Sequence, residues 1–161
     1  QIEAIVLTHG HYDHMANLHS LAKLCDAPVY IGEYDLAFLN DDTLCLAGHF
    51  GEHAPSIAAS PLADGDTIGE FIVMHTPGHT RGSICLYREE DGALITGDTL
   101  FPHGSFGRSD LPTGSHADLV TSINRLAALG IDSLWCGHDI PVPSSAMRDV
   151  LLSQAEVPRY G

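Results

Sequence analysis

Residues 5–17 read IVLTHGHYDHMAN, a short apolar run that is followed at once by metal-type side chains. Three histidines and one aspartate fall between residues 9 and 14, namely His9, His11, Asp13 and His14. Packing in a core or a solvated surface explains such a cluster poorly, because crowded imidazoles and carboxylates are stabilised mainly by a cation. The stretch therefore predicts a buried strand that ends in a metal-binding loop.

Three later apolar runs end in a similar pattern, with a glycine just before a polar side chain. They are VMHTPGH ending at His79, ALITGD ending at Asp98, and LWCGH ending at His138. A glycine at such a point lets the backbone turn sharply and lets other groups approach closely. We therefore expect the ends of these strands and of the first one to present ligands at one rim, held by rigid elements.

The donors divide into two sets that could share a carboxylate, whose two oxygens allow it to bridge. The sets are His9, His11 and His79, then Asp13, His14 and His138, with Asp98 as the bridge. Imidazole and carboxylate ligands suit Zn, Fe or Mn. Because no thiolate is needed and a coordination position stays open, the pattern favours a catalytic centre over a structural zinc site.

Length and composition predict one globular domain that spans residues 1–161, and the alternation of strand and helix patterns predicts the α/β class. The chain has 44% hydrophobic residues, 17% charged residues and a net charge of −14. Such a surface repels phosphate backbones and anionic lipids, so we expect a small-molecule substrate and neither nucleic acid nor membrane as a partner. Four widely spaced cysteines without a CxxC pair favour free thiols and a cytoplasmic location. The chain opens at Gln1, so we expect an N-terminally incomplete domain, and a signal peptide ahead of it stays open.

Strand patterns alternate with helix patterns along the chain. The expected strands cover residues 2–8, 28–32, 66–76, 83–89, 92–96 and 132–136. The expected helices cover residues 15–25, 33–40, 116–129 and 144–157. Residues 41–60 are expected to form a long loop, and loops of this length often act as lids or binding elements. Among the remaining histidines, His49, His53 and His103 lie in expected loops and are candidates to line a pocket.

The segments THGHYDH, TPGHTRGS, TGDTLF and CGHD, between Thr8 and Asp139, resemble the metallo-β-lactamase superfamily and its HxHxDH…H…D…H signature. The resemblance implies an αββα sandwich with two metal ions at one edge of its two sheets. We expect this sandwich to lack the first N-terminal strands. By the family pattern, His9, His11 and His79 hold the first metal, Asp13, His14 and His138 hold the second, and Asp98 bridges them.

The run GDTLF followed by SFGRSDLPTGS is most similar to the glyoxalase-II-like branch, the hydroxyacylglutathione hydrolases and their short relatives. This resemblance implies a hydrolase in which a metal-bound hydroxide attacks a thioester or ester. Asp13 and Asp98 are the expected catalytic carboxylates, and the expected cofactors are two divalent ions, Zn²⁺ first and Fe or Mn as alternatives. Only Arg148 and Arg159 are basic after His138, so a full glutathione site is not expected.

Other functions stay open at this point. Persulfide dioxygenases of the superfamily hold one iron with residues that match His9, His79 and Asp98, and lactonases share the scaffold. A metal-binding fragment or an assembly component would be no enzyme at all. Arg81 and Arg108 flank ligand motifs, and each could contact substrate or form an internal salt bridge. The oligomeric state is not predicted by the sequence.

Overall fold

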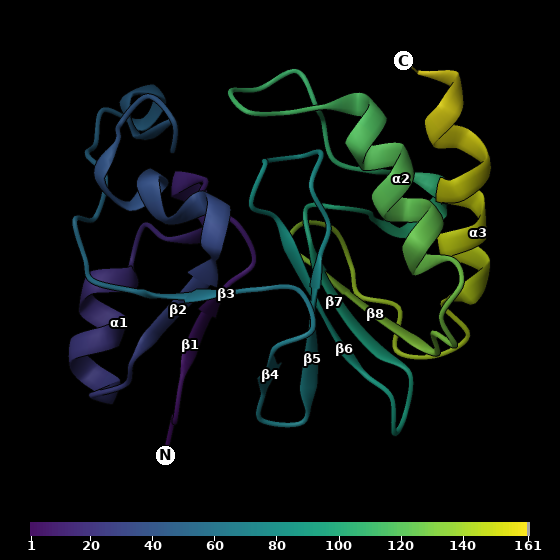
Figure 1. Ribbon diagram of the computed structural model, residues 1–161, viewed down its shortest axis with the longest axis horizontal. Coiled ribbons are helices and arrows are strands. Elements are labelled where there is room, and N and C mark those ends of the chain that lie inside the picture. The colour runs from purple at the N-terminus through teal and green to yellow at the C-terminus, as the bar shows by residue number, and fades with distance from the viewer. Residues whose placement is uncertain (161) are drawn as a thin grey trace.

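Three short parallel strands form the first sheet of the computed structural model, which describes residues 1–160. The sheet order is β1 (Ile5–Leu7), β2 (Val29–Gly32) and β3 (Ser60–Leu62). Val6 lies opposite Tyr30, and Tyr30 lies opposite Ser60. The strand β1 therefore lies at one edge of this sheet and ends directly before the histidine cluster (Figure 1).

The second sheet has five strands in sequence order. They are β4 (Thr67–Ile68), β5 (Phe71–His75), β6 (Ile84–Arg88), β7 (Ala93–Gly97) and β8 (Ser133–Cys136). Neighbours from β4 to β7 are antiparallel, whereas β7 and β8 are parallel. Consequently β5, β7 and β8 run in the same direction, and their carboxyl ends meet at one edge of the sheet.

Helices cover the outer faces of both sheets. Helix α1 (Leu18–Cys25) lies beside the first sheet, and α2 (His116–Leu126) and α3 (Met147–Glu156) lie beside the second (Figure 1). The 3₁₀ turns are η1 (Tyr12–His14), η2 (Glu33–Asn40), η3 (Ala47–Phe50), η4 (Pro102–Gly104) and η5 (Val157–Arg159). No helix in the described part of the chain is long and apolar enough to cross a membrane.

The core forms three layers because side chains alternate between the two faces of each strand. Between the sheets, Leu62 packs with Val73 and Ile84. The outer face of the first sheet packs Ile31 with residues such as Met15 and Leu18, and the outer face of the second packs α2 and α3. This helix–sheet–sheet–helix order confirms the predicted αββα sandwich.

Two local expectations differ from the structure. Residues 66–76 were expected to form one strand, but a tight turn at Gly69, where φ is +58°, divides them into the hairpin β4–β5. Residues 33–40 form the expected short helix, which is the 3₁₀ helix η2, and its Asp35 is buried and bonded to other loops. The expected 41–60 loop is irregular apart from η3, but its last residue, Ser60, begins β3, a strand that was not predicted.

Candidate metal centre

The opening cluster is shaped by one tight turn after β1. His9 and His11 follow the strand directly, and the 3₁₀ turn η1 then places Asp13 and His14. The His14 N–H donates to the His11 carbonyl at 3.1 Å, which closes the turn. Four polar side chains within six residues therefore converge on one side of the chain.

The first group of donors joins the two sheets. His9 and His11 come from the loop after β1, and His79 comes from the loop after β5. Their candidate ligand atoms all lie within 4.8 Å of one another, and all three residues are buried. Nδ1 of His11 lies 2.9 Å from Nε2 of His79. Two ring nitrogens that face each other at this distance mark a place where a cation could accept both lone pairs.

The second group of donors lies nearer the surface. It consists of Asp13, His14 and His138, with candidate ligand atoms again within 4.8 Å of one another. Nε2 of His138 lies 3.2 Å from Nε2 of His14 and 3.2 Å from Oδ2 of Asp13. Like the first group, it takes residues from both sheets, since His138 follows β8.

Asp98 lies between the two groups. Its Oδ2 is 3.7 Å from Nε2 of His79 and 3.3 Å from Nε2 of His138. Its Oδ1 is 3.3 Å from Nε2 of His14. One carboxylate thus contacts members of both groups, which is the position that a bridging ligand requires.

Burial sets the protonation of the first group. It lowers the pKa of His9 well below the usual value, and the neighbouring imidazoles lower this pKa further. Burial also lowers the pKa of His11 to about 4 and lowers that of His79. The pKa of His14 is raised, because the Asp98 carboxylate outweighs the opposing effect of burial. The first three imidazoles are therefore neutral at pH 7, the form that binds metals.

Two buried nitrogen atoms test whether metal ions would fit here. Nε2 of His9 and Nε2 of His11 are buried and have no hydrogen-bond partner. Unpaired buried polar atoms are uncommon and call for an explanation such as an ion. The donors around them are imidazole nitrogens and carboxylate oxygens, a set typical of Zn, Fe and Mn sites. The residues present therefore fit divalent metal ions.

Glycines before the donors allow close packing, against other donors at Gly137 and against helix α2 at Gly78. A Cβ atom at Gly137 would overlap Oδ1 of Asp98 and the ring of His14. Gly78, which precedes His79, has a φ of +138°, and a Cβ there would overlap the backbone of Leu119. These contacts give the physical reason for the pattern of glycine before ligand in the sequence.

Hydrogen bonds behind the donors fix their orientation. Nδ1 of His79 lies 2.7 Å from the carbonyl oxygen of Arg108, which leaves Nε2 directed toward Asp98. Such a bond on the far nitrogen sets the tautomer of a ligating imidazole.

Asp35 connects the two donor loops from behind and was not identified from the sequence. Its buried carboxylate accepts hydrogen bonds from the Gly10 N–H at 2.9 Å, the Gly82 N–H at 2.8 Å and the Thr80 hydroxyl at 2.7 Å. Gly10 separates His9 from His11, and Thr80 follows His79 directly. An acidic residue inside the apolar run YDLAFL was the one local signal that could have indicated this role.

A pocket of about 610 Å³ opens onto the donors. Its apolar wall consists of Leu46, Phe50, Phe101, Phe106 and Leu111, and its lining also includes the donors His11, Asp13, His79, Asp98 and His138. Sequence patterns did not identify this wall. Of the three loop histidines considered, His49 lines the pocket, whereas His53 and His103 do not.

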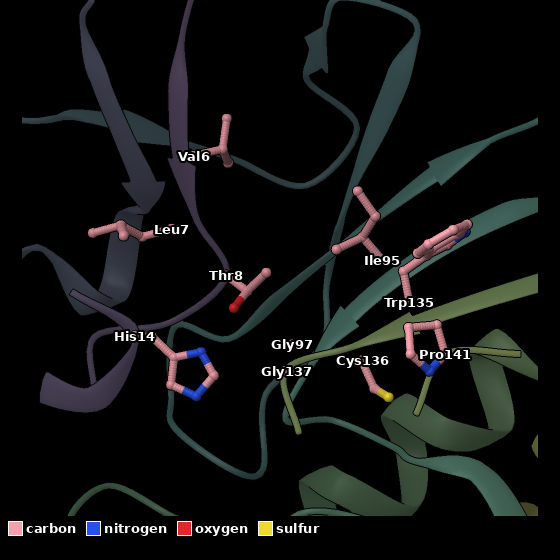
Figure 2. Close-up of a pocket in the computed structure, with 10 residues that line it drawn as sticks. All are labelled: Val6, Leu7, Thr8, His14, Ile95, Gly97, Trp135, Cys136, Gly137 and Pro141. Atoms are coloured by element: carbon pink, nitrogen blue, oxygen red, sulfur yellow. The ribbon is translucent and has the colours of Figure 1, made fainter. Parts of the chain in front are cut away.

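A second pocket, of about 360 Å³, reaches His14 from the gap between the sheets. Figure 2 shows Val6 and Leu7 on one side of this gap and Ile95 and Trp135 on the other. Cys136, the residue before Gly137, also lines it. His14 therefore lines this second cavity, which opens beside the edge strand β1.

The two arginines considered as substrate contacts have different surroundings. Arg108 lines the larger pocket, but its guanidinium forms a two-point ion pair with Asp110, with both distances 2.8 Å. Arg81 is outside the lining, and its Nε donates to the carbonyl of Tyr34 at 2.9 Å. For Arg108, the structure therefore shows the internal salt bridge that was the alternative to substrate contact.

Sequence comparisons identify the relatives of the chain. The metallo-beta-lactamase superfamily matches residues 1–138. An uncharacterized protein of Aquifex aeolicus is 41% identical over 145 residues, which are 86% of this chain and 68% of that protein. A Bacillus subtilis protein named "Probable metallo-hydrolase" is 37% identical over 76% of this chain and 60% of its own length. A hydroxyacylglutathione hydrolase of Thermosynechococcus vestitus is 36% identical over 86% of this chain and 50% of its own length. The chain thus spans between half and about two thirds of these proteins.

Two solved structures are similar over almost the whole chain. A protein crystallised in a di-iron-bound form has a TM-score of 0.79 and 32% identity, covering 96% of this chain and 75% of that one. A B3 metallo-beta-lactamase has a TM-score of 0.82 and 30% identity, covering 99% of this chain and 78% of that one.

Proposed function

Because this chain belongs to the metallo-beta-lactamase superfamily, we propose that it is a metal-dependent hydrolase of thioesters or esters. The observation that carries the proposal is the pair of three-donor groups joined by Asp98 at the floor of a pocket. Relatives named as metallo-hydrolases and as a hydroxyacylglutathione hydrolase support this reaction class. We propose a cytoplasmic location as well, in agreement with the four free cysteines.

The proposed ligands are the residues that the structure gathers. His9, His11 and His79 would hold one ion, Asp13, His14 and His138 would hold a second, and Asp98 would contact both. Zn²⁺ is the first choice, with Fe or Mn as alternatives, and the relative in a di-iron-bound form keeps iron open. When bound, two such ions supply a water acidic enough to react at neutral pH and stabilise negative charge on the carbonyl oxygen.

The residues of the chain orient the reactants. Water oxygen bonds to the carbonyl carbon, the bond to the thiol or alcohol breaks, and a proton passes to the leaving group. Asp13 lines the pocket and is partly exposed, so its carboxylate is placed to accept the water proton. The carbonyl of Arg108 holds the ring of His79 in place throughout.

The donor geometry favours two metal ions over one. A single-iron dioxygenase would use His9, His79 and Asp98, and the separate group of Asp13, His14 and His138 would then have no metal to hold. Lactone and β-lactam hydrolysis would use the same donors and differ only in the substrate that the pocket accepts.

Elemental analysis of the purified chain, with activity assays, tests the proposal. About two Zn, Fe or Mn atoms per chain with thioester or ester hydrolysis supports it. The variant His79→Ala should lose activity by about 100-fold or more while its circular dichroism spectrum stays unchanged. About one iron per chain with oxygen uptake on a glutathione persulfide would contradict the proposal in favour of a dioxygenase.

A further inference from the structure

We propose that the substrates are thioesters or esters with uncharged, apolar groups on both sides of the carbonyl, and that glutathione thioesters are poor substrates. This inference rests on the proposed hydrolase function and specifies its substrate class. It follows from the apolar side chains of the pocket wall and from the ion pair that Arg108, which lines the pocket, forms with Asp110.

The wall beside the donors is apolar. It consists of Leu46 and Phe50 from the 41–60 loop and of Phe101, Phe106 and Leu111 from the segment after β7. The ring of Phe101 lies 6.3 Å from that of His138, so the apolar surface begins next to a donor. A carbonyl placed at the donors would bring its substituents against these side chains, where uncharged groups are favoured.

Phe50 extends this wall toward solvent. It is 56% exposed, and its ring lies 5.5 Å from that of Tyr12, the residue between His11 and Asp13. The ring is thus held beside the donor loop while one part of it faces water. An apolar group of the substrate would cover that part and remove it from water, which is favourable.

In the described part of the chain, no arginine or lysine lines the pocket without a carboxylate partner of its own. Among residues 1–160, Arg108 is the one arginine or lysine in the lining, and Asp110 binds its guanidinium at two points. A glutathione thioester carries two carboxylates and one ammonium. Either carboxylate would have to compete with Asp110 for this guanidinium, and the net charge of −14 adds long-range repulsion.

The test compares two thioesters of the same acyl group on the zinc-loaded protein. S-phenylacetyl-N-acetylcysteamine is uncharged, and S-phenylacetylglutathione is anionic. We expect kcat/KM to be about 10-fold higher for the uncharged thioester than for the glutathione thioester, chiefly because its KM is lower. In Asp110→Asn the guanidinium of Arg108 becomes available, so the preference should shrink by about 3-fold or more.

A matched control removes an equivalent ion pair elsewhere. Asp91 binds the guanidinium of Arg88 at two points, with distances of 2.9 and 2.7 Å, outside the donor pocket. Asp91→Asn should leave the substrate preference unchanged. The variant Phe50→Ser, which removes part of the apolar wall, should raise KM for S-phenylacetyl-N-acetylcysteamine more than for S-acetyl-N-acetylcysteamine. Leu24→Ser, at an exposed position of α1, is its control.

The outcomes separate the two proposals. The substrate inference is wrong if kcat/KM is equal for the glutathione thioester and the uncharged thioester. It is also wrong if Asp110→Asn keeps the parental preference between them. In both cases the hydrolase function stands. If the metal-loaded protein hydrolyses neither thioester nor the corresponding phenylacetate ester, the hydrolase function is wrong and the inference falls with it.

Discussion

Replacing Asp35 with alanine should loosen both donor loops at once. The substitution removes the acceptor of two buried backbone N–H groups, those of Gly10 and Gly82. The Thr80 hydroxyl keeps a partner, because Ser83 Oγ lies 2.7 Å away. The loss therefore falls on two backbone N–H groups, one between the donors His9 and His11 and one three residues after His79.

The magnitude follows from these two groups. Each buried donor left without an acceptor costs about 1–3 kcal/mol. Burial raises the pKa of Asp35, so removing the carboxylate also relieves some cost of burying charge. We expect a net loss of about 2–4 kcal/mol in the free energy of unfolding. For a chain of this length, that loss lowers Tm by about 5–15 °C.

The loss should also reach the metal centre. Removing groups that orient metal ligands typically weakens metal binding by about 10–100-fold. Because Asp35 acts through the backbone of Gly10 and Gly82 and not through a donor itself, we expect a value near the lower limit. Thermal unfolding in the presence of a chelator measures the first effect, and zinc titration with a competing chelator measures the second.

Asp66→Ala serves as the control, since Asp66 is exposed and its side chain accepts one hydrogen bond, from the Ala63 N–H. Its Tm should change by less than about 3 °C. If Asp35→Ala matched the parent in both Tm and zinc affinity, the carboxylate would not hold the loops. A lower Tm with unchanged zinc affinity would limit its role to the stability of the fold.

Three further measurements test the structure. Gly137→Ala should lose metal while keeping its circular dichroism spectrum, because the added Cβ overlaps Asp98 and His14; full metal content would show that the packing is looser. Removing metal with a chelator should lower Tm, and zinc should restore it, since a ligand at 100 times its Kd contributes about 2.7 kcal/mol; an unchanged Tm would argue against a site in the folded state. The Arg125 guanidinium lowers the pKa of Asp64, so this pair stabilises the fold above about pH 4 and the contribution disappears as pH falls further. Asp64→Asn should therefore show a flatter loss of Tm between pH 5 and 2, as measured by thermal scans, and a curve parallel to the parent's would contradict this assignment.

The positions of the donors could be predicted because their signals are local. An apolar strand followed by glycine and a polar ligand indicates where the strand ends. It also indicates that other donors lie close to the backbone at the glycine, as Asp98 and His14 do at Gly137. The sandwich could be predicted through the same motifs. The division of residues 66–76 was missed because Gly69 lies inside an otherwise continuous strand pattern, and a glycine there is also typical of a bulge.

Asp35 and the apolar pocket wall could not be predicted for a different reason. Asp35 is 47 positions from Gly82, one of its partners, so its burial depends on how two loops meet in space. Phe101 and Phe106 read as loop residues in the sequence, and only the tertiary arrangement brings them into one pocket with Phe50. Interactions between distant segments leave no periodic signal in either segment.

Each donor group takes residues that follow strands of both sheets. The distances within each group therefore depend on how the two sheets are packed against each other. A small slide of one sheet along the other would change distances within both groups together, for example between His11 and His79 and between His14 and His138. A spectroscopic ion such as Co²⁺ would then report strain in the sandwich through its visible absorption. Substitutions between the sheets, far from any donor, could then be ranked by how much they change the packing of the sheets, as read from the visible absorption of the Co²⁺-loaded protein.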